Sequence, residues 1–312
     1  MAVNPAVTAG APALPRRRRS PRRSTRQRWT GWGFVGPFLA VFAFVLIVPI
    51  GYAIYMSLFR QQLIGGNAFV GISNYKLALS DPQFWGSLRR VLLFFAVQVP
   101  LMLVLALLAA LALDSARLRW APLYRLSIFL PYAVPAVVAA LMWGFMYGTQ
   151  FGLVAKARSL LGAWVPDPLS SSWVLASIGN IVTWEFVGYN MLIFYSALRA
   201  VPRELYEAAE IDGATATGIV RWIKLPALRT AIVVALVFSV IGSLQLFNEP
   251  DVLHPVTPDT LPYNFTPNMY AYNLSFSGQE YNYSAAIAII MGIITVIIAA
   301  AVQWYGQRRA AA

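Results

Sequence analysis

The sequence predicts an all-α, polytopic membrane protein. Of its 312 residues, 59% are hydrophobic and only 12% are charged, which is about half the charged fraction of a soluble domain. The apolar residues form long charge-free runs, each close to the roughly 20 residues that a helix needs to cross about 30 Å of hydrocarbon. These runs are continuous rather than alternating, so helices are the only spanning structure that fits them and a β-barrel is excluded.

Six such runs predict six transmembrane helices within a domain of residues 31–308. They are Trp32–Met56, Val91–Leu113, Ile128–Tyr147, Trp173–Leu198, Ala231–Phe247 and Ala285–Trp304. The first run contains Pro37 and Pro49, and the second is bounded by Arg90 and Asp114. Between the fourth and fifth runs lies a polar loop, residues 199–228, which interrupts an otherwise apolar chain.

Basic residues indicate the orientation of these helices. Eight of the 24 Lys and Arg residues lie in residues 1–30, which are predicted to form a disordered tail that contacts anionic lipid. The apolar run after this tail is too long for a secretory signal peptide, and no small-residue cleavage site closes it. With the N-terminus inside, 18 basic residues fall in inner segments and 6 in outer ones. The positive-inside rule therefore predicts that both termini, and the loop at 199–228, are cytoplasmic.

The composition excludes several kinds of chemistry. The chain has no cysteine, which excludes disulfides and thiolate catalysis. With a single histidine, His254, no His-rich metal site is expected. No G-x-x-x-x-G-K-[ST] phosphate-binding loop is present. We therefore expect no catalytic residue, no metal and no cofactor on this chain, which is not expected to be an enzyme.

The loop at 199–228 predicts a bent pair of short helices. Four of the twelve acidic residues (Glu204, Glu207, Glu210, Asp212) lie in it. Leu205, Ala208 and Ala209 recur at helical spacing and form one apolar face. Gly213 then ends the first helix, since glycine adopts the positive φ found at helix ends. Such a pair either presents itself to a cytoplasmic partner or lies as an ordinary amphipathic helix at the membrane surface.

The order and spacing of residues in this loop resemble the coupling loop, or EAA motif, of ABC-importer permease subunits. The matching positions are Glu207, Ala208, Ala209, Gly213, Ile223, Leu225 and Pro226, and Asp212 before Gly213 is also typical. Further segments, Phe69–Tyr75, Phe129–Pro135 and Leu244–Pro250, look like carbohydrate permeases of the maltose/lactose/multiple-sugar type. The resemblance covers about residues 30 to 307. The chain departs from it in the Arg-rich tail and at His254–Pro258, where the family usually has Gly-Gly-Pro.

The resemblance implies a transmembrane permease subunit of an ATP-driven, binding-protein-dependent sugar importer in the cytoplasmic (inner) membrane of a prokaryote. Its implied partners are a second homologous permease subunit, a cytoplasmic ATPase dimer that holds ATP and Mg, and an extracytoplasmic solute-binding protein. The ATPase would dock on the coupling loop and, by closing, switch the helices between inward-facing and outward-facing states. The implied coupling residues are Glu207, Ala208, Ala209, Asp212, Gly213, Ile223, Leu225 and Pro226.

A candidate substrate site follows from one intramembrane charge. Glu185 is the only acid placed within a predicted span, and a charge there is a functional-site hypothesis by default. Carboxylate and amide groups bind sugar hydroxyls, and aromatic rings pack against sugar faces. The candidate substrate residues are Trp184, Glu185, Tyr189, Asn190, Gln245 and Asn248. In the alternative interpretation, Glu185 is a structural residue that pairs with the sister subunit.

Two alternatives remain open on the sequence, one a different transporter class and the other a different substrate. An ion-coupled secondary transporter usually carries several intramembrane ionisable residues, whereas one Glu stands alone here. Within the importer class, the alternative substrate is glycerol-3-phosphate or another polyol. A phosphate would need a basic site, and the predicted spans hold no Lys or Arg. The sequence therefore favours a neutral mono- or oligosaccharide as substrate.

Overall fold

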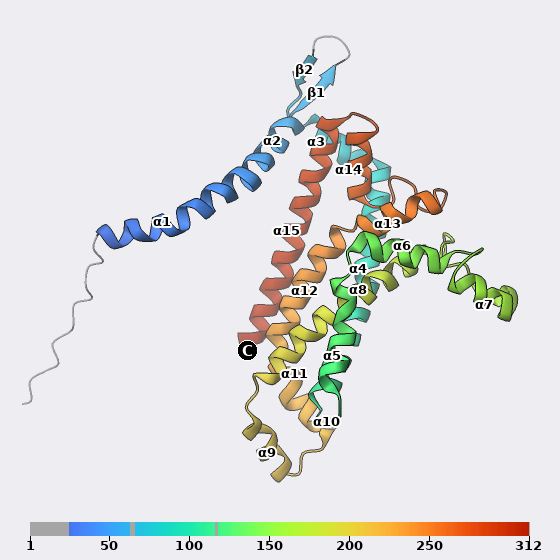
Figure 1. Cartoon of the computed structure of the whole chain (residues 1–312). Helices are drawn as coiled ribbons and strands as arrows, with labels where there is room; N and C mark the ends of the chain where they lie inside the picture. Colours follow the sequence, from blue (N-terminus) through green and yellow to red (C-terminus); the bar gives the residue numbers. More distant parts are fainter. Residues whose placement is uncertain (1–24, 63–65, 116–117, 312) are drawn as a thin grey trace, which may run out of the picture. The chain divides into compact units, whose positions relative to one another are not determined.

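The computed structural model describes residues 25–62, 66–115 and 118–311, and it is almost entirely helical (Figure 1). Residues 1–24 of the predicted tail lie outside the described residues. The remaining tail residues, 25–30, are helical and begin the first helix. The chain divides into two compact units, Met1–Tyr52 and Ala53–Ala312, which are treated separately below.

In the first unit, a helical run accounts for the first predicted span. It consists of α1 (Thr25–Phe42), a π turn η1 (Ala43–Ile47) and α2 (Val48–Ser57), whose last residues belong to the second unit. Residues Trp32–Ser57 are long and apolar enough to cross a membrane, which confirms the prediction. The π turn ends at Ile47, two residues before Pro49. Because proline has no N–H to donate to the carbonyl four residues earlier, a locally widened helix is the usual response.

A small hairpin follows in the second unit. Strands β1 (Phe59–Gln62) and β2 (Gly66–Phe69) pair antiparallel with Phe59 opposite Phe69, and α3 (Ser73–Ser80) comes next. The buried side chain of Asn74 donates hydrogen bonds to the carbonyls of Ser57 at 2.8 Å and Phe59 at 2.7 Å. These bonds fix the start of the hairpin against α3.

The second span is longer than predicted. Helix α4 covers Pro82–Asp114, so its start at Val91 and the boundary at Arg90 were wrong. Asp81 caps this helix by accepting from the N–H of Gln83 at 2.8 Å. The guanidinium of Arg90 donates to the carbonyl of Asn264 at 3.0 Å, which compensates its charge within the helix. The expectation that the spans hold no Lys or Arg is therefore corrected at Arg89 and Arg90, and Arg199 and Arg229 are end residues of two other candidate spans.

Asp81 also ties three helices together at this end of the second unit. Its carboxylate accepts hydrogen bonds from the hydroxyls of Tyr270 at 2.6 Å and Tyr283 at 2.8 Å. Burial alone would raise the pKa of Asp81, but these hydrogen bonds and those from backbone N–H groups outweigh burial, so the pKa is lowered. The carboxylate therefore stays ionised at neutral pH, and its contribution to stability is lost only as the pH falls through this lowered pKa.

The third span is broken. Helix α5 (Ala121–Phe129) continues into a 3-10 turn η2 (Leu130–Ala133), and α6 (Ala136–Tyr147) then leaves at a bend of 97°. Pro135 causes this break, since it lacks an N–H and forces the preceding Val134 into an extended conformation with ψ 129°. Among the described residues there are thus five candidate spanning helices, or six if the bent pair counts as one span. The straight span predicted over Ile128–Tyr147 is corrected to this bent pair.

The remaining elements complete the second unit. They are α7 (Leu153–Leu161), η3 (Gly162–Trp164), α8 (Val174–Arg199), α9 (Arg203–Ile211), α10 (Ala216–Ile219), η4 (Val220–Lys224), α11 (Leu225–Ala227), α12 (Arg229–Leu244), α13 (Asn248–Leu253), η5 (His254–Val256), α14 (Pro267–Phe276) and α15 (Tyr281–Ala311). Helix α8 agrees closely with the fourth predicted span, and α15 contains the sixth and extends beyond it at both ends. The fifth candidate span runs beyond the predicted Phe247, over Arg229–Val256, because α13 and η5 continue after α12.

The core of the second unit lies where α4 packs along α8 and α12 packs along α15 (Figure 1). Small residues of α4, Ala106 and Ala110, lie in one buried cluster with Met191 and Phe194 of α8. A Cβ at Gly188 would lie 2.1 Å from the carbonyl oxygen of Ile128, so only glycine lets the end of α5 approach α8 this closely. Figure 1 shows α9 and α10 at one end of these helices, and α14 and the hairpin at the other.

Candidate functional site

A cavity of about 510 Å³ lies among α4, η2, α8, α12 and the start of α13. Four of the six residues predicted to contact substrate line it, namely Tyr189, Asn190, Gln245 and Asn248. The other two do not appear among the lining residues. The ring of Trp184 packs edge-on against Trp143 at 5.8 Å, and Glu185 is buried.

Aromatic rings form one wall of this cavity. Tyr132 of η2 stacks on Tyr189 of α8 with ring centroids 4.9 Å apart and planes at 18°. Phe186 meets the edge of Tyr132 at 5.8 Å. Tyr132 lies in η2, which continues α5 up to the break and packs against α8. The wall offers a flat apolar surface of the kind that packs against a sugar ring.

Two buried amide oxygens on the cavity lack hydrogen-bond partners. They are Oε1 of Gln98 on α4 and Oδ1 of Asn190 on α8, in side chains only 5% and 3% exposed. Their nitrogens are engaged, since Gln98 donates to the hydroxyl of Thr183 at 3.2 Å and Asn190 to the carbonyl of Phe186 at 3.0 Å. A buried acceptor without a donor is costly, so these two oxygens are candidate acceptors for the O–H or N–H groups of a ligand.

A pair of carboxyl groups lies at the same place. Both carboxylate oxygens of Glu185 are buried and without a hydrogen-bond partner of normal geometry, and the group interacts electrostatically with Glu249. Glu249 lines the cavity and is only 6% exposed. The prediction that Glu185 is the sole acid within a span was therefore wrong, because Glu249 had been placed in an outer loop. Its position directly after an apolar run, before Pro250, was the signal that a helix continues there.

The cavity has no basic lining residue among those that the structure describes. Arg90, although on α4, points its guanidinium toward the carbonyls of Asn264 and Phe265 instead. The lining therefore combines amide and carboxyl acceptors with aromatic surface. This combination suits a neutral ligand rich in hydroxyl groups and disfavours an anion.

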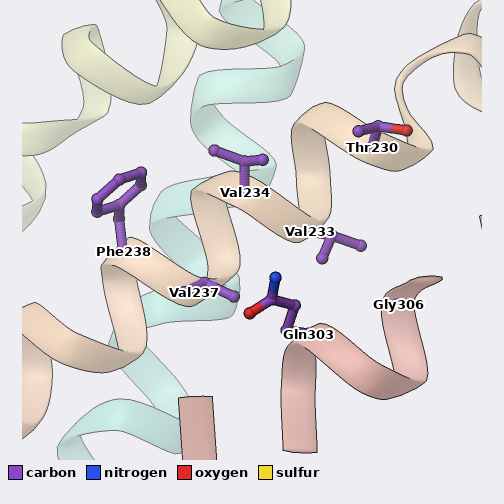
Figure 2. A pocket seen from close by; sticks show the side chains of 7 residues that line it. All are labelled: Thr230, Val233, Val234, Val237, Phe238, Gln303 and Gly306. Carbon is purple, nitrogen blue, oxygen red and sulfur yellow. The ribbon is translucent and has the colours of Figure 1, made fainter. Parts of the chain in front are cut away.

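A second groove, of about 230 Å³, lies between α12 and α15 (Figure 2). Its lining is almost wholly apolar, and Val233 and Val237 lie beside its single amide, Gln303. Exposed side chains such as Phe238 and Val234 border it. With one amide and no aromatic stack, this groove lacks the polar groups that a sugar needs.

The loop at 199–228 differs in detail from the predicted helix pair. Gly213 follows α9 with φ +79°, the positive value expected of a glycine that ends a helix. Thr215 caps α10, since its hydroxyl accepts from the N–H of Gly218 at 3.2 Å. The second helix of the predicted pair is a continuous helical run over residues 216–227, made of α10, the π turn η4 and α11.

Three large apolar side chains of this loop are exposed. Leu205 is 52% exposed, Trp222 is 72% exposed, and Ile211 is 87% exposed. Glu207, Ala208, Asp212 and Gly213 are exposed as well, whereas Ile223, Leu225 and Pro226 are half-buried. Exposed apolar side chains on a partly acidic loop could contact a partner protein.

Comparisons with known proteins agree on one family. The family described as "Binding-protein-dependent transport system inner membrane component" matches residues 77–311. The chain is 31% identical to the lactose transport system permease protein LacF of Rhizobium radiobacter, over 92% of this chain and 97% of that protein. It is 30% identical to the sulfoquinovosyl glycerol transport system permease protein SmoG of Agrobacterium fabrum, over 88% and 92% of the two chains.

A solved structure shares the fold. It is a bacterial alginate ABC transporter in complex with an alginate pentasaccharide-bound periplasmic protein, and one of its chains superimposes with a TM-score of 0.80 at 20% identity. The match covers 91% of this chain and 96% of that one.

Proposed function

The chain belongs to the family of binding-protein-dependent transport system inner membrane components, and on this premise we propose that it is the permease subunit of an ATP-driven importer of a neutral sugar. It is a multi-pass protein of the prokaryotic inner membrane. We further propose that both termini are cytoplasmic, as the distribution of basic residues predicts. Membership of this family sets the ion-coupled secondary transporter aside.

The cavity supports the choice of a neutral sugar. The observation that carries this proposal is the pair of buried, unpartnered acceptor oxygens on Gln98 and Asn190. Sugar hydroxyls would donate to them while the ring of the sugar packs on Tyr132 and Tyr189. The relatives are named for chemically different substrates, so their names do not identify which sugar this chain transports. Because no described lining residue is basic, the cavity also gives no support to glycerol-3-phosphate.

The loop at 199–228 supports the ATP-driven mechanism. Its exposed apolar residues Leu205, Ile211 and Trp222 would enter a groove on a cytoplasmic ATPase subunit, and Glu207 would pair with a basic group there. ATP and Mg would be bound by that partner. Closure of two ATPase subunits would then displace the loop and alternate the access of the cavity between the two sides of the membrane.

Two more partners complete the proposed importer. A solute-binding protein would deliver the sugar on the outer side, as the periplasmic protein seen with the alginate transporter suggests. A second, homologous permease subunit would close the cavity from the side that this chain leaves open. The sequence resemblance and the family both support these partners.

Purification of the tagged chain from native membranes in mild detergent tests the proposal. We expect an ATPase subunit and a second permease to copurify in fixed proportion, and the complex to hydrolyse ATP. The variant Ile211→Arg, which places a charge on the exposed tip of the loop, is expected to lose the ATPase and keep the second permease. Recovery of the wild-type chain alone under conditions that preserve other membrane complexes would contradict the proposal.

A further inference from the structure

Helix α9 is held to the rest of the second unit by few side chains. Only Tyr206 and Ala209 of its nine residues are not exposed. The hydroxyl of Tyr206 is buried and has no hydrogen-bond partner. Burial and the nearby charge of Asp114 both raise the pKa of this phenol, which places the ring close to that carboxylate. Tyr206 is therefore the main side chain through which α9 meets the membrane helices.

Lys224 connects Tyr206 to Asp114. Its ammonium nitrogen lies 5.4 Å from the centre of the Tyr206 ring and 2.5 Å from Oδ2 of Asp114. The side chains of Lys224 and Asp114 are only 14% and 9% exposed. An exposed ion pair contributes little, but a shielded one is costly to break because the remaining charge loses its partner. This shielded pair joins residues 110 positions apart in the sequence.

Asp114 is the last residue of α4, the helix that carries Gln98 and Met102 on the wall of the cavity. From Asp114 to Gln98 the helix runs for about 24 Å, at about 1.5 Å per residue. Along that length α4 packs against α8, and Gln98 is hydrogen-bonded to Thr183 of α8. Because Asp114 and the cavity wall belong to the same packed helix, a displacement of Asp114 would also move the part of α4 that lines the cavity.

We propose that Tyr206, Lys224 and Asp114 form the joint that transmits movement of α9 to α4 and so to the cavity. The three act as positioning residues, since they lie on neither the cavity nor the exposed tip of the loop. The proposal rests on the function proposed above, in which an ATPase moves α9. In this proposal, the shielded ion pair of Lys224 and Asp114 and the aromatic ring of Tyr206 transmit the movement.

Reconstitution of the complete complex in proteoliposomes tests this joint. The quantities measured are sugar imported, ATP hydrolysed and ATPase bound, for wild type, Lys224→Met, Asp114→Asn and the exchanged pair D114K/K224D. Each single variant is expected to keep its ATPase and its hydrolysis but to import about tenfold less sugar per ATP, within the usual range of coupling between sites. The exchanged pair is expected to recover most of the import. The control Arg221→Met removes an exposed cation of the same loop and is expected to leave the ratio unchanged.

The outcomes separate the joint from the function on which it rests. If the wild-type complex shows no ATP-driven uptake, the proposed function fails. If the wild type is coupled and Lys224→Met imports the same amount per ATP, only the joint is contradicted. If the single variants fail to assemble, the exchanged pair decides: an assembled complex that still imports about tenfold less per ATP contradicts the joint, and restored import supports it.

Discussion

Gly213→Pro and Glu207→Arg are each expected to lower ATP-driven uptake by about 30-fold or more while the protein remains in the membrane. Gly213 has φ +79°, and proline is confined to about −65°, so the turn between α9 and α10 would change direction. Glu207 is exposed, so the reversal of its charge in Glu207→Arg removes no internal contact. The new cation would face the basic group that we expect on the partner. Loss of an interface charge pair typically costs about 2 kcal/mol or more, which is about 30-fold.

Gly162→Pro provides the matched control for the backbone change. Gly162 also has a positive φ, +69°, but it follows α7 and begins the short turn η3, outside the loop at 199–228. Uptake in membrane vesicles, normalised to the amount of protein in the membrane, separates uncoupling from loss of the chain. Normal uptake by both Gly213→Pro and Glu207→Arg would remove the coupling function from this loop.

The double variant Q98L/N190L is expected to lower the uptake efficiency for a neutral sugar by about 25-fold. Each amide oxygen would lose one hydrogen bond from a sugar hydroxyl, worth about 1 kcal/mol or about fivefold. Leucine is close in size to both amides, so the wall keeps its shape and the ATPase should remain bound. Each single variant should lower the uptake efficiency by about fivefold, because the two oxygens lie on different helices and their effects should multiply.

Initial rates of uptake at several concentrations of a radiolabelled neutral sugar give this efficiency, with lactose as the first probe. Gln303→Leu is the matched control, since it makes the same substitution on the apolar groove between α12 and α15 (Figure 2). We also expect an excess of unlabelled neutral sugar to compete better than an excess of a uronic acid. Unchanged uptake by Q98L/N190L would show that the two oxygens do not meet the substrate.

Most of the spanning helices could be predicted from the sequence, because the hydropathy and length of a segment determine whether it can cross a membrane. The errors arose where a local contact overrides that pattern. Arg90 appeared to end a span, yet its charge is compensated by the carbonyls of Asn264 and Phe265, which are 174 and 175 residues away in sequence. Pro135 was a visible helix breaker inside the third run, but only the structure shows that the break turns the chain by 97°. Long-range partners and bend angles are not encoded in local periodicity.

Part of the candidate site could also be predicted. Tyr189, Asn190, Gln245 and Asn248 lie on one cavity, as expected of polar and aromatic residues in otherwise apolar helices. Gln98 and Tyr132 were missed, although an amide in the middle of an apolar run was a usable signal for Gln98. Tyr132 reaches the cavity because η2 packs against α8, and Glu249 because α13 continues the fifth span. Both depend on tertiary structure.

ATP-dependent uptake by the purified complex in proteoliposomes tests the central claim most directly. The liposomes enclose ATP and Mg, and a radiolabelled neutral sugar is added outside with the cognate solute-binding protein. The proposal predicts accumulation of sugar that requires enclosed ATP and the binding protein, and that Gly213→Pro abolishes. Accumulation that persists without ATP and follows an imposed ion gradient would contradict it.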